Sequence, residues 1–149
     1  MSEGSEQTAR DALRAVGDAA AGLVSGTDPL AGLRAARSIE LAAGSAVLGY
    51  VRACRERGVS WHEIGAAAGL SSADDSGLTV AGRAFTLATD PLRHAWSRDF
   101  AWTCRTCGGP VTDHGPGRSP GEQEDGHAPG CQQLAAAVRA WLAESASGV

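Results

Sequence analysis

The sequence predicts a mainly α-helical protein with a small metal-binding module in its C-terminal part. Apolar side chains recur with a helical period over much of residues 6–96, in a chain rich in Ala, the strongest helix former. After residue 98 the composition changes, and three of the four Cys and four of the six Pro lie there. We therefore predict a helical domain over residues 1–98 and a zinc-binding module over residues 99–149.

Two long helices are expected to open the helical domain. The first covers residues 6–24, and the second runs from residue 29 to about residue 57. Asp28 is a favourable N-cap for the second helix, and Pro29 is tolerated at its first position. Gly58 fits the left-handed residue that ends many helices.

Shorter helices are expected to complete this domain. Ser60 and Glu63 form a capping-box pattern at the start of a third helix, which Gly69 ends. A fourth helix then extends to residue 88. A repeat of the Asp-Pro signal predicts one or two helical turns over residues 91–96.

The C-terminal part has a different pattern. Residues 99–104 predict a short strand, and the Gly- and Pro-rich residues 115–126 predict a solvated loop. The last helix is predicted from about residue 131 to residue 145. Its apolar residues follow the spacing of a single buried face: Leu134, Val138, Trp141 and Leu142.

The most specific chemical signal is a pair of short Cys/His motifs. Cys104-x2-Cys107 is followed by His127-x3-Cys131, a spacing that suits one tetrahedral Zn²⁺ ion. His114 is the competing candidate for the third ligand. Four protein ligands leave no position for a water molecule, so we predict one structural rather than catalytic zinc ion.

The expected order of a strand, a Cys-x2-Cys turn, a returning strand and a helix resembles the treble-clef type of zinc module. This resemblance covers roughly residues 100–145. It implies a short hairpin and a helix around the ion. Reduced cysteines at metal-binding spacing also favour the cytoplasm over an oxidising compartment, and no signal peptide or membrane span is expected.

The segment Ser60–Ser71 resembles the first helix and turn of bacterial helix-turn-helix proteins. Ile64 matches the core aliphatic position of that family, and Gly65 matches a small residue at the helix contact. The resemblance implies a diverged helix-turn-helix over residues 60–88 in which the second helix approaches DNA. The candidate nucleic-acid contacts are Ser72, Arg83, Arg52, Arg55 and Arg57.

Charge argues against strong DNA binding. Asp74 and Asp75 would lie at the start of the recognition helix, and the chain has a net charge of -4. Carboxylates near phosphates oppose binding, since phosphate neutralisation normally dominates affinity for DNA. The arginines before the turn could equally form a solvated helix end that complements the helix dipole.

Taken whole, the chain resembles a group of small actinobacterial proteins. They combine a helix-turn-helix-like segment with a C-terminal zinc module. The shared residues are here Ser60–Leu70, Trp102–Gly108 and Glu124–Cys131. The last of these segments supports His127 as the third ligand. The resemblance implies no particular activity.

These observations predict a binding protein rather than an enzyme. The first hypothesis is a zinc-stabilised cytosolic regulator that engages DNA through the diverged helix-turn-helix. The alternative is a protein–protein interaction adaptor in which that motif serves only packing. A metal-dependent enzyme is a distant third possibility, since motifs for nucleotide binding and for a serine nucleophile are missing. The sequence leaves the oligomeric state open.

Overall fold

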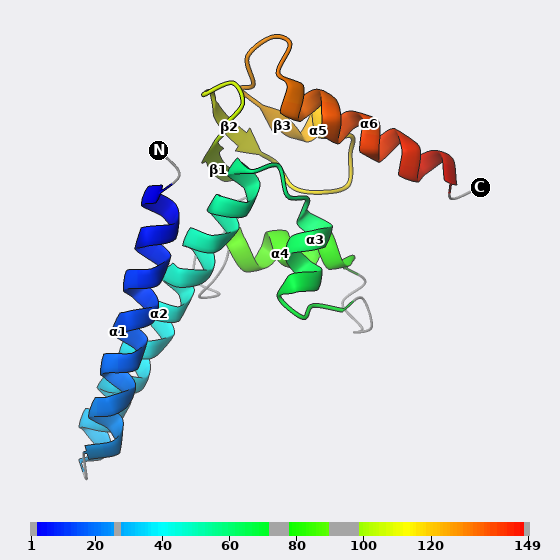
Figure 1. Cartoon of the computed structure of the whole chain (residues 1–149). Helices are drawn as coiled ribbons and strands as arrows, with labels where there is room; N and C mark the ends of the chain where they lie inside the picture. The colour runs from blue at the N-terminus through cyan, green and yellow to red at the C-terminus, as the bar shows by residue number, and fades with distance from the viewer. Residues whose placement is uncertain (1–2, 26–27, 72–77, 90–98, 148–149) are drawn as a thin grey trace.

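A computed structural model describes residues 3–25, 28–71, 78–89 and 99–147 of the chain (Figure 1). The elements follow in the order α1 (Glu3–Ser25), α2 (Pro29–Glu56), α3 (Trp61–Ala67), α4 (Val80–Thr89), β1 (Phe100–Thr103), β2 (Pro110–Asp113), α5 (Pro120–Gln123), β3 (Glu124–Asp125) and α6 (Gln132–Ser147). The prediction of a mainly helical chain is therefore confirmed. Among the described residues, no helix combines the length and apolar character that crossing a bilayer requires.

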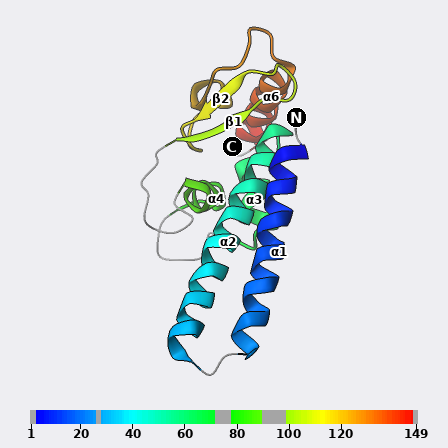
Figure 2. The same cartoon turned by 90° about the vertical axis from the view of Figure 1, so that its left-hand side faces the viewer.

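Helices α1 and α2 form a long antiparallel hairpin that extends away from the rest of the molecule (Figure 2). The Asp28 carboxylate accepts hydrogen bonds from Leu30 N at 3.0 Å and Ala31 N at 3.2 Å, as expected of an N-cap. Small side chains such as Ala9 and Ala46 are buried in the hairpin, so the two helices approach closely.

Helix α3 begins with the predicted capping box. Glu63 N donates to Ser60 Oγ at 3.2 Å, and Ser60 N donates to the Glu63 carboxylate at 2.8 Å. A Cβ atom at Gly65 would lie 2.6 Å from Val80 Cγ1, so the missing side chain allows α3 to lie directly against α4. The predicted first turns of the fourth helix, at residues 72–77, and the predicted helix over residues 91–96 lie outside the described residues. The helix-turn-helix stays a prediction.

The three strands form one antiparallel sheet in the order β1–β2–β3. In the pairing of β1 with β2, Trp102 is opposite Val111. The expectation of a solvated loop over residues 115–126 was wrong for residues 120–125, because these form α5 and β3. A second capping box, between Ser119 and Glu122, begins α5, and the buried Glu124 belongs to β3.

A single cluster of buried side chains joins the helices to the sheet. Trp61 is at its centre and makes edge-to-face contacts with Phe85 and Phe100, at centroid distances of 5.1 and 5.4 Å. The cluster draws on both sides of residue 98, and its buried members are Val51, Trp61, Ile64, Ala84, Ala88, Phe100, Trp102, Cys104, Val111 and Cys131. The division into domains at residue 98 stays a prediction.

Helix α6 differs from its predicted packing. Leu134 and Val138 are half-buried, but Trp141 is 39% exposed and Leu142 is 53% exposed. The helix packs on α5 near its start and then projects beyond the other elements (Figure 1). The expectation that all four apolar residues share one buried face was therefore wrong for Trp141 and Leu142, which keep much of their surface exposed.

Candidate metal centre

The turn between β1 and β2 carries the first two cysteines of the cluster. Gly108 N donates to Cys104 O at 2.7 Å, and Cys104 N donates to Gly109 O at 2.9 Å. Gly108 has a φ of +71°, which glycine adopts without strain. These bonds close a tight turn that places the thiol groups of Cys104 and Cys107 on the same side.

The other two residues of the cluster come from the connection between β3 and α6. Gly126 precedes His127 with a φ of +100°, and a Cβ atom there would lie 2.1 Å from Pro110 O. Only glycine allows the chain to pass so close to β2. Cys131 immediately precedes α6, and its carbonyl accepts a hydrogen bond from Ala135 N at 3.1 Å.

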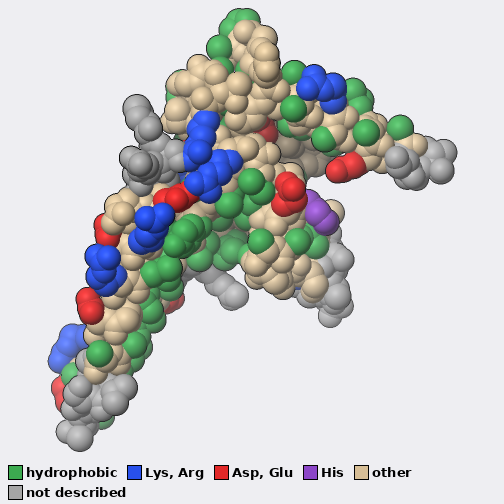
Figure 3. Space-filling model, in the orientation of Figure 1, with side chains coloured by type: hydrophobic (Ala, Val, Ile, Leu, Met, Phe, Trp, Pro, Cys, Tyr) green, Lys and Arg blue, Asp and Glu red, His purple; other side chains and the backbone are tan. Residues whose placement is uncertain are grey.

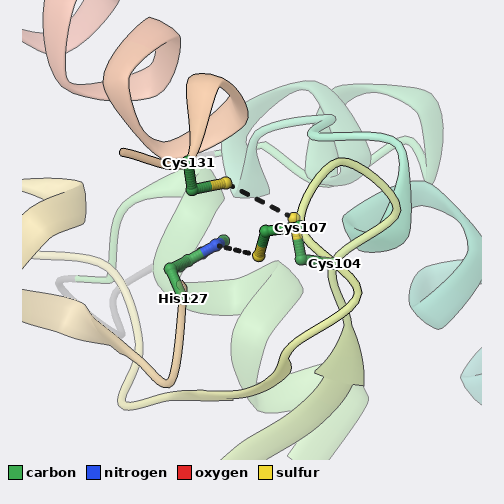
Figure 4. A group of neighbouring side chains, drawn as sticks. All are labelled: Cys104, Cys107, His127 and Cys131. Carbon is green, nitrogen blue, oxygen red and sulfur yellow. Dashed lines mark hydrogen bonds between the residues drawn. The ribbon is translucent and has the colours of Figure 1, made fainter. Parts of the chain in front are cut away.

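These four side chains converge in the structure (Figure 4). The Sγ atoms of Cys104 and Cys131 are 3.7 Å apart, and Cys107 Sγ is 3.7 Å from His127 Nδ1. The four ligand atoms all lie within 4.8 Å of one another. Around a tetrahedral zinc ion, sulfur and nitrogen ligand atoms are about 3.5–3.8 Å apart, given the usual bond lengths. The predicted grouping of these four residues is confirmed, and its dimensions fit one metal ion.

The surroundings of Cys104 and Cys107 shift the pKa values of their thiols in opposite directions. Burial raises the pKa of Cys104 to about 11. Hydrogen bonds from the N–H groups of Ala128 and Gly109 lower the pKa of Cys107 to about 6. Metal binding requires every ligating cysteine to be a thiolate, so a bound cation would have to displace the proton of the Cys104 thiol.

A glutamate orients the histidine of the cluster. Glu124 Oε2 lies 3.0 Å from His127 Nε2, while His127 Nδ1 faces Cys107. Burial opposes protonation of this imidazole, but its contacts with Glu124 and Cys107 raise the pKa of His127. A carboxylate on the outer nitrogen commonly fixes the tautomer of a metal-binding histidine and strengthens the ligand.

Glu124 is in turn held by Arg55, which the sequence offered as a candidate DNA contact or as part of a solvated helix end. The expectation of a solvated helix end was wrong for this residue, since Arg55 is only 4% exposed. Its guanidinium forms ion pairs with Glu124 and with Asp113, the latter at 2.9 Å. It lies 5.1 and 5.2 Å from the ring centroids of Trp61 and Trp102. In this structure the Arg55 guanidinium is buried against two carboxylates and is not exposed at the surface.

The other arginines predicted to contact nucleic acid have partners within the chain. Arg52 Nε donates to Ala101 O at 3.3 Å, and its guanidinium lies 5.7 Å from the centroid of the Phe100 ring. Arg57 forms an ion pair with Glu6, and Arg83 donates a hydrogen bond to Ser71 O. Ser72 lies outside the described residues. DNA contact by these side chains stays a prediction.

His114, the alternative third ligand, has different partners. Its Nδ1 is 2.7 Å from Asp99, and its Nε2 is 2.9 Å from Asp125. These hydrogen bonds, first that to Asp99 and then that to Asp125, raise the pKa of His114. The structure brings His127, and not His114, to the three cysteines.

Sequence reasoning missed the residues that support the cluster. Gln133 Oε1 accepts a hydrogen bond from Thr106 at 3.1 Å, and its Nε2 donates to Arg55 O at 3.3 Å, so it ties the cysteine turn and α6 to α2. The position of Glu124, three residues before His127, is the one signal that could have pointed to its role.

Comparison with family models, curated proteins and solved structures gave no match to this chain. The fold and the cluster therefore define it only as a mainly helical protein with a group of three cysteines and one histidine. The resemblance to small actinobacterial proteins stays a prediction.

Proposed function

We propose that the Cys104, Cys107, His127 and Cys131 cluster binds one structural Zn²⁺ ion. The observation that carries this proposal is the donor set, three sulfurs and one nitrogen that all lie within 4.8 Å of one another. Zinc prefers this set, and four protein ligands complete its coordination. A turn between two strands that faces the start of a helix is also the arrangement of a treble-clef-like module. Because no coordination position remains for water, the site supports a non-enzymatic protein.

We further propose that this zinc-stabilised protein is a cytosolic regulatory adaptor whose partner is another protein. Two observations favour a protein over DNA. The arginines expected to meet phosphates have partners within the chain, and the net charge is -4. Exposed apolar side chains on α6, including Trp141, instead suit a protein contact.

A diverged helix-turn-helix that engages DNA is the second candidate. The close contact of α3 with α4 at Gly65 supports it, because the helices of this motif pack through small residues. Binding of a random-sequence DNA duplex, measured by fluorescence anisotropy in about 50 mM salt, tests it. We expect no binding. Binding that Arg83→Ala weakens would replace the adaptor proposal with the DNA-binding one.

Metal analysis of protein purified without chelator tests the zinc proposal. We expect one Zn²⁺ per chain, and loss of that ion in Cys104→Ser or Cys131→Ser. Cys54→Ser is the matched control, because Cys54 is a half-buried thiol of α2 outside the cluster. A metal-free protein with an intact C-terminal fold would exclude the proposal.

The third ligand is tested separately. His127→Ala should weaken zinc binding far more than His114→Ala, because only His127 has a nitrogen facing the cysteine sulfurs. Competition with a chromophoric chelator measures both affinities. A larger loss of zinc affinity in His114→Ala than in His127→Ala would identify His114, at the end of the β1–β2 hairpin, as the third ligand.

A further inference from the structure

A cleft separates α6 from α3 on the side of the molecule shown in Figure 3. Its volume is about 550 Å³, a size typical of binding sites. One wall is formed by Gly58 and by residues 60–63 at the start of α3, and the opposite wall is formed by α6. The buried Gln123 and Glu124 also belong to its lining.

The α6 wall presents an apolar helix face. Ala137, Ala140, Trp141 and Glu144 all line the cleft, and their spacing of three and four residues places them on one side of the helix. Trp141 keeps 39% of its surface exposed there. The sequence pattern is that of a helix with a buried face, yet in the second half of α6 this face borders the open cleft. An exposed aromatic residue in a concave site is typical of a binding surface.

Carboxylates outnumber arginines among the charged side chains that line the cleft, with Glu63, Glu124 and Glu144 against Arg55 and Arg118. Exposed carboxylates line both walls, Glu63 on α3 and Glu144 on α6, and acidic side chains appear on both sides of the hollow in Figure 3. Among the described residues that line it, Arg118 is an exposed arginine and His62 an exposed histidine. The charge of the buried Arg55 is matched by its two carboxylate partners, Glu124 in the lining and Asp113 behind it in the core. A cationic ligand is therefore favoured, and the phosphates of a nucleic acid are repelled.

We propose that this cleft binds a short peptide segment of a partner protein in which an apolar side chain is flanked by Arg or Lys. The apolar side chain packs on Trp141, and the cationic side chains lie near Glu63 and Glu144. The inference rests on the proposed adaptor function and specifies the kind of peptide sequence that the partner protein presents.

Peptide display on the zinc-loaded full chain tests this inference. The probe is a library of random peptides of about 12 residues, a length that spans such a groove. We expect the selected sequences to be enriched in an apolar residue next to Arg or Lys. Their affinities are then measured by fluorescence anisotropy with synthetic peptides.

Three variants test the location. Trp141→Ala should weaken the selected peptides by at least about 30-fold, as for a central aromatic contact. Glu144→Arg should weaken them most strongly at low salt. Leu142→Ala is the matched control, because Leu142 is the exposed neighbour of Trp141 on the same helix and does not line the cleft. Far-ultraviolet circular dichroism and zinc content should be the same in all three.

The outcomes separate this inference from the proposed function. Failure to enrich basic and apolar peptides, or binding that Trp141→Ala leaves unchanged, overturns the cleft as the docking site. In that case the zinc analysis and the DNA test still decide the proposed function. Duplex DNA binding by the wild-type chain overturns the adaptor proposal itself.

Discussion

Replacing Arg55 with Met tests the buried ion-pair network that connects α2 to the metal centre. Met keeps most of the apolar length of the side chain but removes its charge. Asp113, whose side chain is fully buried, and Glu124 would then lose their shared cation. Removal of one partner from a buried ion pair typically costs about 3–5 kcal/mol, because an unpaired charge remains in the interior.

Arg55 makes further contacts, so we expect the loss of stability in Arg55→Met to reach this range of about 3–5 kcal/mol. Its Nη1 donates to Val59 O at 2.7 Å, and its guanidinium contacts the rings of Trp61 and Trp102. We therefore expect Arg55→Met to lower the free energy of unfolding by at least about 3 kcal/mol. Urea denaturation of the zinc-loaded protein, followed by circular dichroism, measures this difference.

The matched control is Arg52→Met, one helical turn earlier. Arg52 is exposed and makes one hydrogen bond, at 3.3 Å, so its loss should cost no more than about 1 kcal/mol. Combining Arg55→Met with Asp113→Asn should recover part of the loss, because the second substitution neutralises one unpaired carboxylate. Equal losses for the two arginine variants, or strictly additive losses in the double variant, would refute the reasoning.

Three other predictions concern the metal centre, pH and helix packing. Glu124→Gln should weaken zinc binding by about 10–100-fold in a chelator competition. Asp125→Asn is the control and should leave zinc binding unchanged. Equal effects of the two substitutions would exclude a role for Glu124 in orienting the histidine. Hydrogen bonds to two carboxylates raise the pKa of His114 above its unfolded value, so they add stability below about pH 6.5 that is lost as the pH rises through the folded-state pKa. His114→Gln should then reduce the melting temperature near pH 6 and not near pH 9, and a pH-independent change would contradict this assignment. Gly65→Ala should destabilise the protein by about 1–3 kcal/mol, because its Cβ atom would lie 2.7 Å from a backbone oxygen of α4. Gly17→Ala, with no atom within 4 Å of the new Cβ, should stabilise it by about 0.5–1 kcal/mol, and thermal melts that rank the two alike would contradict the packing argument.

Features that depend on neighbouring residues were predictable from the sequence. The Asp28 cap and the capping box of Ser60 and Glu63 form because donor and acceptor are within three residues of each other. The cluster of three cysteines and His127 could be predicted for a related reason, since short spacings within each pair leave few ways to reach a common ion.

Features that depend on distant partners were not predictable. The sequence shows Arg55 only as a cation near a helix end, and the carboxylates that allow its burial come from β2 and β3. The pattern around Trp141 indicates an apolar helix face, but it does not tell whether the covering surface belongs to this chain or to another. The missed helix α5 is different, because Ser119 and Glu122 carry a capping-box signal within a segment rich in Gly and Pro.

The distance along the chain between Arg55 and its two carboxylates has a consequence for the order of folding. Asp113 and Glu124 follow Arg55 by 58 and 69 residues, so α2 leaves the ribosome well before either acid does. During that interval Trp61 cannot pack against the Arg55 guanidinium without burying a charge that has no ion-pair partner. The hairpin of α1 and α2 can form early from local contacts, but the core beside it has to wait for the sheet. Folding should therefore be slower than the high helix content of this chain implies.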